Sequence, residues 1–264
     1  MDRIITLTTD FGLKDPYLGA MKGSILSINP AARIIDITHM ITPGDVSEGA
    51  LLLKDACAYF PPSTIHVAVV DPGVGGPRRP VLIETERYLF VGPDNGLFSR
   101  ALEREKVLRI VHLTDKKFFN KTVSPTFHGR DIFGPVAAHL SLGAGPAAFG
   151  TPIEALEGGA VTAQKRGDGT VVTGSVIYVD SYGNLITDID EEDIAPLRRA
   201  GLEVLIKGRS LEGIKATYSE AEEGALAALI GSSGRLEIAV NLGSAQKTLE
   251  AGVGEKVVVR VAKR

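Results

Sequence analysis

The sequence predicts an α/β fold, with an N-terminal α/β domain around a largely parallel central sheet and a smaller, barrel-like C-terminal β domain. Three observations lead to this prediction. Apolar runs alternate with helical patterns over residues 3–70, and short β-branched runs separated by glycine-containing turns fill residues 171–261. The chain has 264 residues, which is long enough for two modest domains, each with its own core.

The boundary between the two domains is expected where periodicity is lost. Residues 143–150 and 154–169 are rich in glycine, alanine and charged side chains and show no clear helical or strand pattern. We therefore expect an N-terminal domain at 1–152, a linker at 153–169 and a C-terminal domain at 170–264.

The elements of the first domain follow from hydrophobic periodicity. Alternating strands and helices are typical of βαβ units, in which consecutive strands lie parallel. The expected order is strand 3–9, helix 17–28, strand 33–38, helix 46–59, strand 65–70, strands 81–85 and 88–91, helix 97–105, strand 108–113 and helix 132–142.

The second domain reads as a mainly antiparallel β structure. Its apolar runs are short, contain many β-branched residues and are bounded by turns with glycine, as in small barrels. The expected strands are 171–179, 185–189, 202–206, 226–230, 236–240 and 256–261.

Composition and charge exclude several classes of function. The formal net charge is −3 and no Lys/Arg block occurs, so the chain lacks the basic field expected of a nucleic-acid-binding protein. No apolar run approaches the ~20 residues needed to span a bilayer, and no signal-peptide pattern precedes the first strand. We expect a cytoplasmic protein. Cys57, the single cysteine, lies on the apolar side of an expected helix and is predicted to be a buried, inert thiol.

A candidate site begins where the expected strand 65–70 ends. Its apolar run leads into Asp71, a turn containing Gly73, Gly75 and Gly76, and then Arg78. The ends of buried parallel strands are where open α/β sheets build ligand sites. The turn lacks the Gly-Lys-Ser/Thr of a nucleotide P-loop. A carboxylate and a guanidinium are therefore expected to face one pocket.

Further motifs extend this pattern over most of the chain. Asp10-Phe11-Gly12 follows the first strand, and Pro-Thr-Phe-His-Gly-Arg-Asp occupies 125–131. Asp-Ser-Tyr-Gly-Asn occupies 180–184, and Gly-Ser-Ser-Gly-Arg-Leu-Glu-Ile-Ala occupies 231–239. With Val-Asp-Pro-Gly-Val-Gly, these motifs resemble the S-adenosylmethionine hydroxide adenosyltransferases. The resemblance implies hydrolysis of S-adenosylmethionine to adenosine and methionine, and kinship with enzymes that attack the same substrate with fluoride or chloride.

The resemblance also implies which residues act on water. It assigns Asp71, Arg78 and His128 to the group that places a water molecule in line behind the ribose C5′, opposite the sulfonium. Asp71 and His128 are both plausible proton acceptors, and Arg78 would orient Asp71. This chemistry needs neither a metal ion nor a cofactor, and none is expected.

The substrate-binding residues are expected in both domains. Asp10 suits two ribose hydroxyls, because one carboxylate accepts from both, and the resemblance adds Phe11 beside it. Asp15 is a weaker ribose ligand or the N-cap of the helix that follows. The remaining candidates are Phe127, Tyr182 and Tyr218 as adenine-stacking rings, Asp180 and Asn184 for the ammonium, Ser232 and Ser233 for the carboxylate, and Glu237 and Ala239 beside the adenine edge.

This division of ligands implies an assembly. If one site needs residues of both domains, the C-terminal domain can pack on its own chain or on a neighbouring one, and the related enzymes use the neighbour. We therefore expect a homotrimer whose sites each draw residues from two chains.

Three alternative functions remain open from the sequence. A halogenase is disfavoured because the carboxylate of Asp71 would repel halide. A module that binds adenosine or S-adenosylmethionine without turnover would not need the Asp71, Arg78 and His128 set. A metal-dependent hydrolase would have to use Asp10, His39, Asp45, Asp71 and His128, whose spacing matches no common metal motif.

Overall fold

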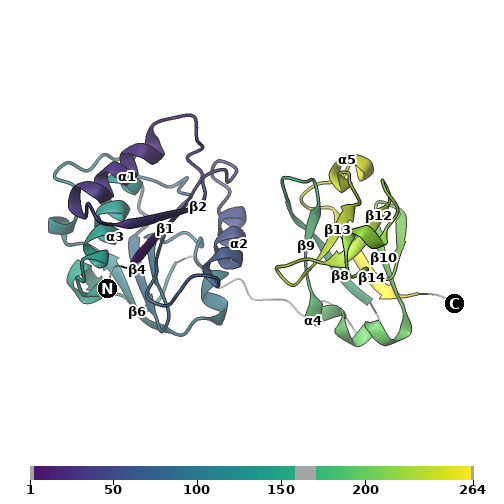
Figure 1. Ribbon diagram of the computed structural model, residues 1–264. Coiled ribbons are helices and arrows are strands. Elements are labelled where there is room, and N and C mark those ends of the chain that lie inside the picture. The colour runs from purple at the N-terminus through teal and green to yellow at the C-terminus, as the bar shows by residue number, and fades with distance from the viewer. Residues whose placement is uncertain (1–2, 158–170, 263–264) are drawn as a thin grey trace. The chain divides into compact units, whose positions relative to one another are not determined.

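A computed structural model describes residues 3–157 and 171–262 of the chain (Figure 1). The chain divides into two compact units, residues 1–162 and 163–264. Each unit contains a seven-stranded sheet. Most of the linker predicted at 153–169 lies outside the described residues.

The first sheet has the order β2-β1-β3-β5-β4-β6-β7. β1 pairs in parallel with β2 and β3, and β3 pairs in parallel with β5, whereas β4, β6 and β7 are antiparallel to their neighbours. The predicted fold class, with a largely parallel sheet, is confirmed. The strands are β1 Ile4–Thr9, β2 Arg33–Thr38, β3 Ile65–Val69, β4 Pro80–Thr85, β5 Leu89–Pro93, β6 Val107–Leu113 and β7 Gly150–Pro152.

Helices cover both faces of this sheet. Figure 1 shows α1 (Tyr17–Ile28) and α3 (Gly134–Ser141) on one side and α2 (Val46–Cys57) on the other. Val67 and Val69 of β3 join the core under α1 and α3, and Ala68 and Val70 join the core under α2. The uninterrupted apolar run of β3 is therefore explained, because successive side chains of one strand point into two different cores.

Two local expectations in this unit were wrong, and one expected helix begins earlier than predicted. The helix expected at 97–105 is only the 3₁₀ helix η1 (Ala101–Arg104), because the apolar positions end at Leu102 and β6 begins at Val107. The helix expected at 132–142 is present as α3, and a π-helical turn, η3 (Gly129–Phe133), precedes it and moves the start of the helical segment to residue 129. Asp15 does not cap α1: Pro16 occupies the N-cap and no side chain bonds there.

The stretch from residue 143 to 152 belongs to the first unit despite its weak patterning. It forms the 3₁₀ helix η4 (Pro146–Phe149) and the edge strand β7, which pairs with β6. A further 3₁₀ turn, η2, spans Lys116–Phe118.

The second unit is a β structure with strand order β11-β10-β14-β8-β9-β13-β12, and every pair in it is antiparallel. A bridge between Lys215 and Leu229 joins the segment after β11 to β12, so the sheet nearly closes, as the barrel-like prediction required. The strands are β8 Val171–Val179, β9 Leu185–Asp190, β10 Leu202–Ile206, β11 Arg209–Glu212, β12 Leu226–Ile230, β13 Arg235–Val240 and β14 Lys256–Val261.

Sequence periodicity missed five short elements in the described part of this unit. β11 contains one apolar residue, Leu211, which gives no alternation to detect. The others are too short to show a helical period: α4 Glu191–Ile194, α5 Ala245–Leu249, and the 3₁₀ helices η5 Ala195–Ala200 and η6 Tyr218–Glu220.

Candidate functional site

The first unit brings two strand ends together at one edge of its sheet. β1 and β3 are parallel neighbours, with Thr9 paired to Val69, so Asp10 and Asp71 follow the two strands at the same edge of the sheet. The chain runs from β1 to β2 on one side of β1 and then crosses to β3 on the other, which makes this edge a topological switch point. Open α/β sheets bind ligands in the crevice at such points.

Asp71, Arg78 and His128 form one contiguous network. Arg78 Nε donates to Asp71 Oδ1 at 2.9 Å, and Arg78 Nη2 donates to Asp71 Oδ2. The same Nη2 lies 2.7 Å from His128 Nδ1. The side chains of Asp71 and Arg78 are 4% and 9% exposed, so water screens this pair poorly. Arg78 thus bridges a carboxylate and an imidazole.

Two glycines allow the segments that carry this network to approach one another. A Cβ on Gly75, whose φ is +76°, would lie 2.3 Å from the carbonyl oxygen of Pro125. A Cβ on Gly129 would lie 2.9 Å from the ring of Phe11. Any side chain at either position would push the His128 segment away from the strand ends.

His128 is held in a fixed place at the start of η3. The following Asp131 is buried, and its carboxylate accepts from Ser124 N at 2.9 Å, from Asn120 Nδ2 at 3.0 Å and from Arg130 Nε at 2.7 Å. Burial lowers the pKa of His128 below its usual value, and the Arg78 cation lowers it further. The imidazole is therefore neutral at pH 7.

Asp10 lies at the end of β1 with one oxygen already engaged. Its Oδ2 accepts from Gly44 N at 2.8 Å. Next to it, the ring of Phe11 packs edge-on against Phe127, with ring centroids 5.6 Å apart, and Tyr17 contacts Phe127 from another side at 5.5 Å. Asp10 therefore places a carboxylate beside an aromatic surface formed by these three rings. Asp15, the weaker candidate, is exposed.

In the second unit, Asp180 and Asn184 are bonded mainly to their own turn. Asp180 Oδ1 accepts from Tyr182 N and Asn184 N, both at 2.9 Å, and Oδ2 accepts from Asn184 Nδ2 at 3.0 Å. Asn184 is 6% exposed, whereas Tyr182 is 78% exposed. The turn is thus held by hydrogen bonds among its own residues and presents the Tyr182 ring to solvent.

Tyr218 and Glu237 form a second polar pair in this unit. Tyr218 Oη donates to Glu237 Oε1 at 2.7 Å. Burial and the nearby carboxylate of Asp180 raise the pKa of Glu237, although the bond from Tyr218 opposes them. Ala239 is fully buried in β13, and Ser232 and Ser233 are exposed in the turn between β12 and β13.

The sequence-predicted residues therefore gather in two groups. Asp71, Arg78 and His128, with Asp10, Phe11 and Phe127, lie in the first unit, and Asp180, Tyr218 and Glu237 interact in the second. Two further residues were not predicted from the sequence: Gly44, whose N–H donates to Asp10, and Tyr17, whose ring contacts Phe127. The Pro-Gly pair at 43–44 signalled a turn, but periodicity does not show what a turn contacts.

The residues of the alternative metal site have other partners. His39 Nδ1 bonds to Thr9 Oγ1 at 2.9 Å, and its Nε2 lies 3.1 Å from Asp36. Asp45 caps α2 by accepting from Glu48 N at 2.9 Å. Among residues 3–157 and 171–262, no group of three or more His, Cys, Asp or Glu side chains is arranged to hold a metal ion.

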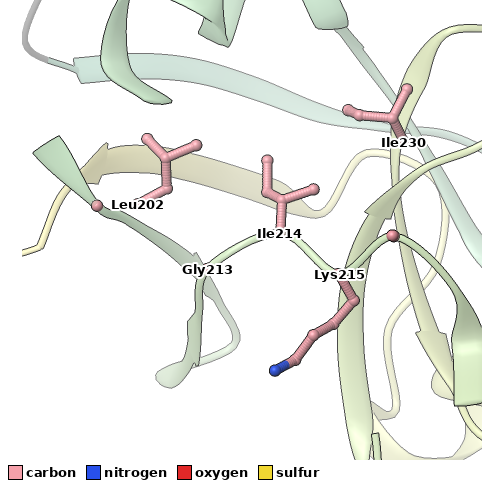
Figure 2. A pocket seen from close by; sticks show the side chains of 7 residues that line it. Leu202, Gly213, Ile214, Lys215 and Ile230 are labelled. Atoms are coloured by element: carbon pink, nitrogen blue, oxygen red, sulfur yellow. The ribbon is translucent and has the colours of Figure 1, made fainter. Parts of the chain in front are cut away.

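A pocket of about 510 Å³ lies in the second unit, apart from the predicted site residues. It is lined by Leu202, Ile214, Ile230, Lys215 and small residues, and Figure 2 shows Lys215 extending away from the Ile214 side chain. Its lining is otherwise apolar or glycine and offers no carboxylate for a cationic ligand. In the described part of the chain, no helix is long and apolar enough to cross a membrane.

Comparison with known proteins places the chain in a family. The N-terminal domain model of the S-adenosylmethionine hydroxide adenosyltransferases matches residues 5–150, and the C-terminal domain model matches residues 174–258. An (R)-S-adenosyl-L-methionine hydrolase of Salinispora tropica is 36% identical over 262 residues, covering 97% of each chain. A fluorinase of Nocardia brasiliensis is 27% identical over 300 residues, covering 98% of this chain and 97% of the other.

A solved structure agrees with these matches. The crystal structure of a conserved protein from Thermotoga maritima superposes with a TM-score of 0.90 at 35% sequence identity, covering 97% of this chain and 100% of that one. Both domain models, the strand-end motifs and the shared fold lead to one conclusion: the chain belongs to the S-adenosylmethionine hydroxide adenosyltransferase family.

Proposed function

We propose that the protein hydrolyses S-adenosylmethionine to adenosine and methionine by in-line attack of water on the ribose C5′. The observation that carries the proposal is the Arg78 guanidinium bonded to both Asp71 and His128 at the strand-end crevice. The family supports it, because a relative that is 36% identical over 97% of both chains bears the name of an (R)-S-adenosyl-L-methionine hydrolase.

The hydrogen bonds favour Asp71 as the proton acceptor. The guanidinium of Arg78 has donors and no acceptor, so His128 must accept at Nδ1 from Arg78 Nη2, 2.7 Å away. A neutral imidazole that accepts at Nδ1 carries its proton on Nε2, where it can only donate. His128 would therefore orient the water by donating to its oxygen. Asp71 keeps lone pairs beyond those facing Arg78 and takes the proton.

The water, the substrate and the Asp71 carboxylate account for every bond and proton in the reaction. The water oxygen forms a bond to C5′ while the C5′–S bond breaks, and the electron pair of that bond neutralises the sulfonium to the thioether of methionine. The water loses one proton to Asp71 and becomes the 5′-hydroxyl of adenosine. Because opposite charges are neutralised as the bond forms, a site that excludes bulk water favours the attack. We propose that no metal or cofactor takes part.

We further propose how the substrate is held. Asp10 accepts from the ribose hydroxyls with the oxygen lone pairs left beside its bond to Gly44, and Phe11 and Phe127 line the same crevice. From the second unit, Tyr182 and Tyr218 would contact the adenine, Asp180 and Asn184 the ammonium, and Ser232 and Ser233 the carboxylate, with Glu237 and Ala239 beside the adenine edge. Asp15 remains the weaker ribose candidate.

Halogenation is the second candidate, since a fluorinase is also a relative of this chain. The carboxylate of Asp71 argues against it. An anion approaching the same position would meet a second negative charge, and Arg78 is already committed to neutralising the first.

The test is incubation of the purified protein with S-adenosylmethionine in the presence of a chelator, with both products measured by chromatography. We expect adenosine and methionine in equal amounts, and no 5′-halogenated nucleoside when chloride or fluoride is added. Activity that is lost on chelation and restored by a divalent cation would overturn the metal-free mechanism. Formation of a halogenated nucleoside would favour the second candidate.

We also propose a homotrimer whose sites each draw residues from two chains, because the binding candidates are divided between two units that each have a core of their own. An Asp71→Ala chain and an Asn184→Ala chain, each nearly inactive, should regain part of the activity when refolded together. Circular dichroism of each variant alone checks that it folds. A monomer by light scattering, or no recovery in oligomers shown to be mixed, would contradict this assembly.

A further inference from the structure

The loop that carries Asp71 and Arg78 passes over the end of a third strand. It begins at Val70, directly after β3, and enters β4 at Pro80, yet β3 and β4 are not neighbours, because β5 lies between them in the sheet. β5 is parallel to β3 and antiparallel to β4, so the residues that follow β5 emerge directly between the two ends of the loop. These residues are Asp94 and Asn95.

Both ends of the loop are bonded to this dipeptide. At the first end, Asn95 Nδ2 donates to the carbonyl oxygen of Val70 at 2.9 Å, one residue before Asp71. At the second end, Asp94 N donates to the carbonyl oxygen of Arg79 at 2.9 Å, one residue after Arg78. Asp94 and Asn95 therefore determine the distance between the backbone of Asp71 and the backbone of Arg78.

The Asp94 carboxylate reinforces the second end. Its Oδ2 accepts from Arg79 Nε at 3.0 Å and from Arg79 Nη2 at 2.6 Å, and the side chain is 1% exposed. The carboxylate also accepts from Glu157 N, at 3.0 Å to Oδ1 and 3.1 Å to Oδ2, and Arg79 Nη2 donates to the carbonyl oxygen of Ala155. A buried charge with this many partners is strongly constrained in position.

We propose that Asp94 and Asn95 are positioning residues for the reaction, holding the Asp71–Arg78 pair in its productive geometry from beneath the loop. The expected effect on kcat rests on the proposed function, whereas the expected effect on the geometry of the Asp71–Arg78 pair does not. Neither residue is assigned a contact with substrate. Since a displacement of about 1 Å in a catalytic group can cost on the order of 10²-fold in rate, loss of this support should lower kcat rather than raise KM.

The chain contains a matched control for Asn95. Asn29 also donates one side-chain hydrogen bond at 2.9 Å, to Ser141 Oγ, and its Oδ1 accepts from Ala31 N at 3.1 Å. Asn95 Oδ1 accepts in the same way from Leu97 N at 3.2 Å. Asn29→Ala therefore removes nearly the same bonds as Asn95→Ala, in the same unit, at the far end of α1 from the strand-end crevice.

The kinetic experiment compares Asn95→Ala with Asn29→Ala at matched folded fractions. We expect Asn95→Ala to lower kcat roughly ten- to a hundredfold, with KM changed less than about threefold, and Asn29→Ala to leave both near their wild-type values. Asp94→Asn should lower kcat in the same way as Asn95→Ala. Equal kcat in Asn95→Ala and Asn29→Ala would overturn the proposal.

A structural readout separates failure of this proposal from failure of the proposed function. Crystal structures of the two variants report the Asp71–Arg78 geometry whether or not S-adenosylmethionine is the substrate. We expect the bidentate pair to be displaced in Asn95→Ala and intact in Asn29→Ala. An intact pair in Asn95→Ala contradicts the positioning role, whereas a displaced pair in a protein without hydrolase activity contradicts only the proposed function.

Discussion

The strand-end site of the first unit and the turn at 180–184 of the second unit satisfy their polar groups in different ways. Arg78 bonds to residues seven and fifty positions away in the chain, so its network exists only in the folded unit. Asp180 bonds to residues two and four positions away, within a single turn. The first arrangement is preorganised by tertiary packing, and the second by local turn geometry.

Burial shifts the pKa of one ionisable group in each unit toward the neutral form. In the first unit it lowers the pKa of His128, and in the second it raises the pKa of Glu237. Both shifts favour the neutral form, because transfer of a charge from water into the protein costs free energy. The opposite directions predict opposite pH dependences of stability, which allows the two regions to be distinguished experimentally.

The largest expected effect is on turnover, from the network of the first unit. Asp71→Ala and His128→Ala should each lower kcat by roughly 10²–10⁴-fold while KM changes little, because they remove groups that act on water rather than on the bound substrate. Steady-state kinetics measures this. Wild-type turnover by Asp71→Ala would make Asp71 a structural turn residue.

The next effect concerns binding at the same sheet edge. Asp10→Ala should raise KM by roughly ten- to a hundredfold, as expected for loss of hydrogen bonds to a charged group. Asp15→Ala is the control, because Asp15 follows the same strand but is exposed and caps no helix. An equal rise in KM for both variants would make Asp15 a ligand of similar weight.

A smaller effect is expected on the pH dependence of stability through His128. Its lowered pKa means that, as pH falls below about 6.5, the unfolded chain binds a proton that the folded protein does not. His128→Gln, which cannot titrate, should therefore lose less stability than the wild type between pH 6.5 and the lowered folded pKa. Urea unfolding across this range measures the difference, and parallel curves would contradict the burial of His128.

The smallest effect is expected for Glu237 and has the opposite sign. Its raised pKa means that, as pH rises above about 4.5, the unfolded chain releases a proton that the folded protein retains. Glu237→Gln, which still accepts from Tyr218, should gain stability relative to the wild type as pH rises from 4.5 toward 7. Tyr218→Phe removes the bond without the charge and is the control. A difference that is constant with pH would mean that Glu237 is not buried in solution.

Local sequence patterns determined most of the elements. Helix Tyr17–Ile28 and strands Arg33–Thr38 and Lys256–Val261 have the predicted bounds. The helix lies between Pro16 and Asn29, and the two strands are short runs rich in isoleucine or valine. Motif order within the chain was enough to identify the family and the candidate residues. β11, which was missed, pairs with β10 and owes its conformation to that strand rather than to its own residues.

Tertiary structure alone decided how the candidate residues combine. The sequence placed Asp71, Arg78 and His128 on loops but left two proton acceptors open, and only the distance from Arg78 Nη2 to His128 Nδ1 favours one tautomer. It contained Asp94 and Asn95 without any sign that they support the loop, because that role follows from β5 lying between β3 and β4. Periodicity records which face of an element is buried, whereas contacts between loops depend on strand order, which no local pattern encodes.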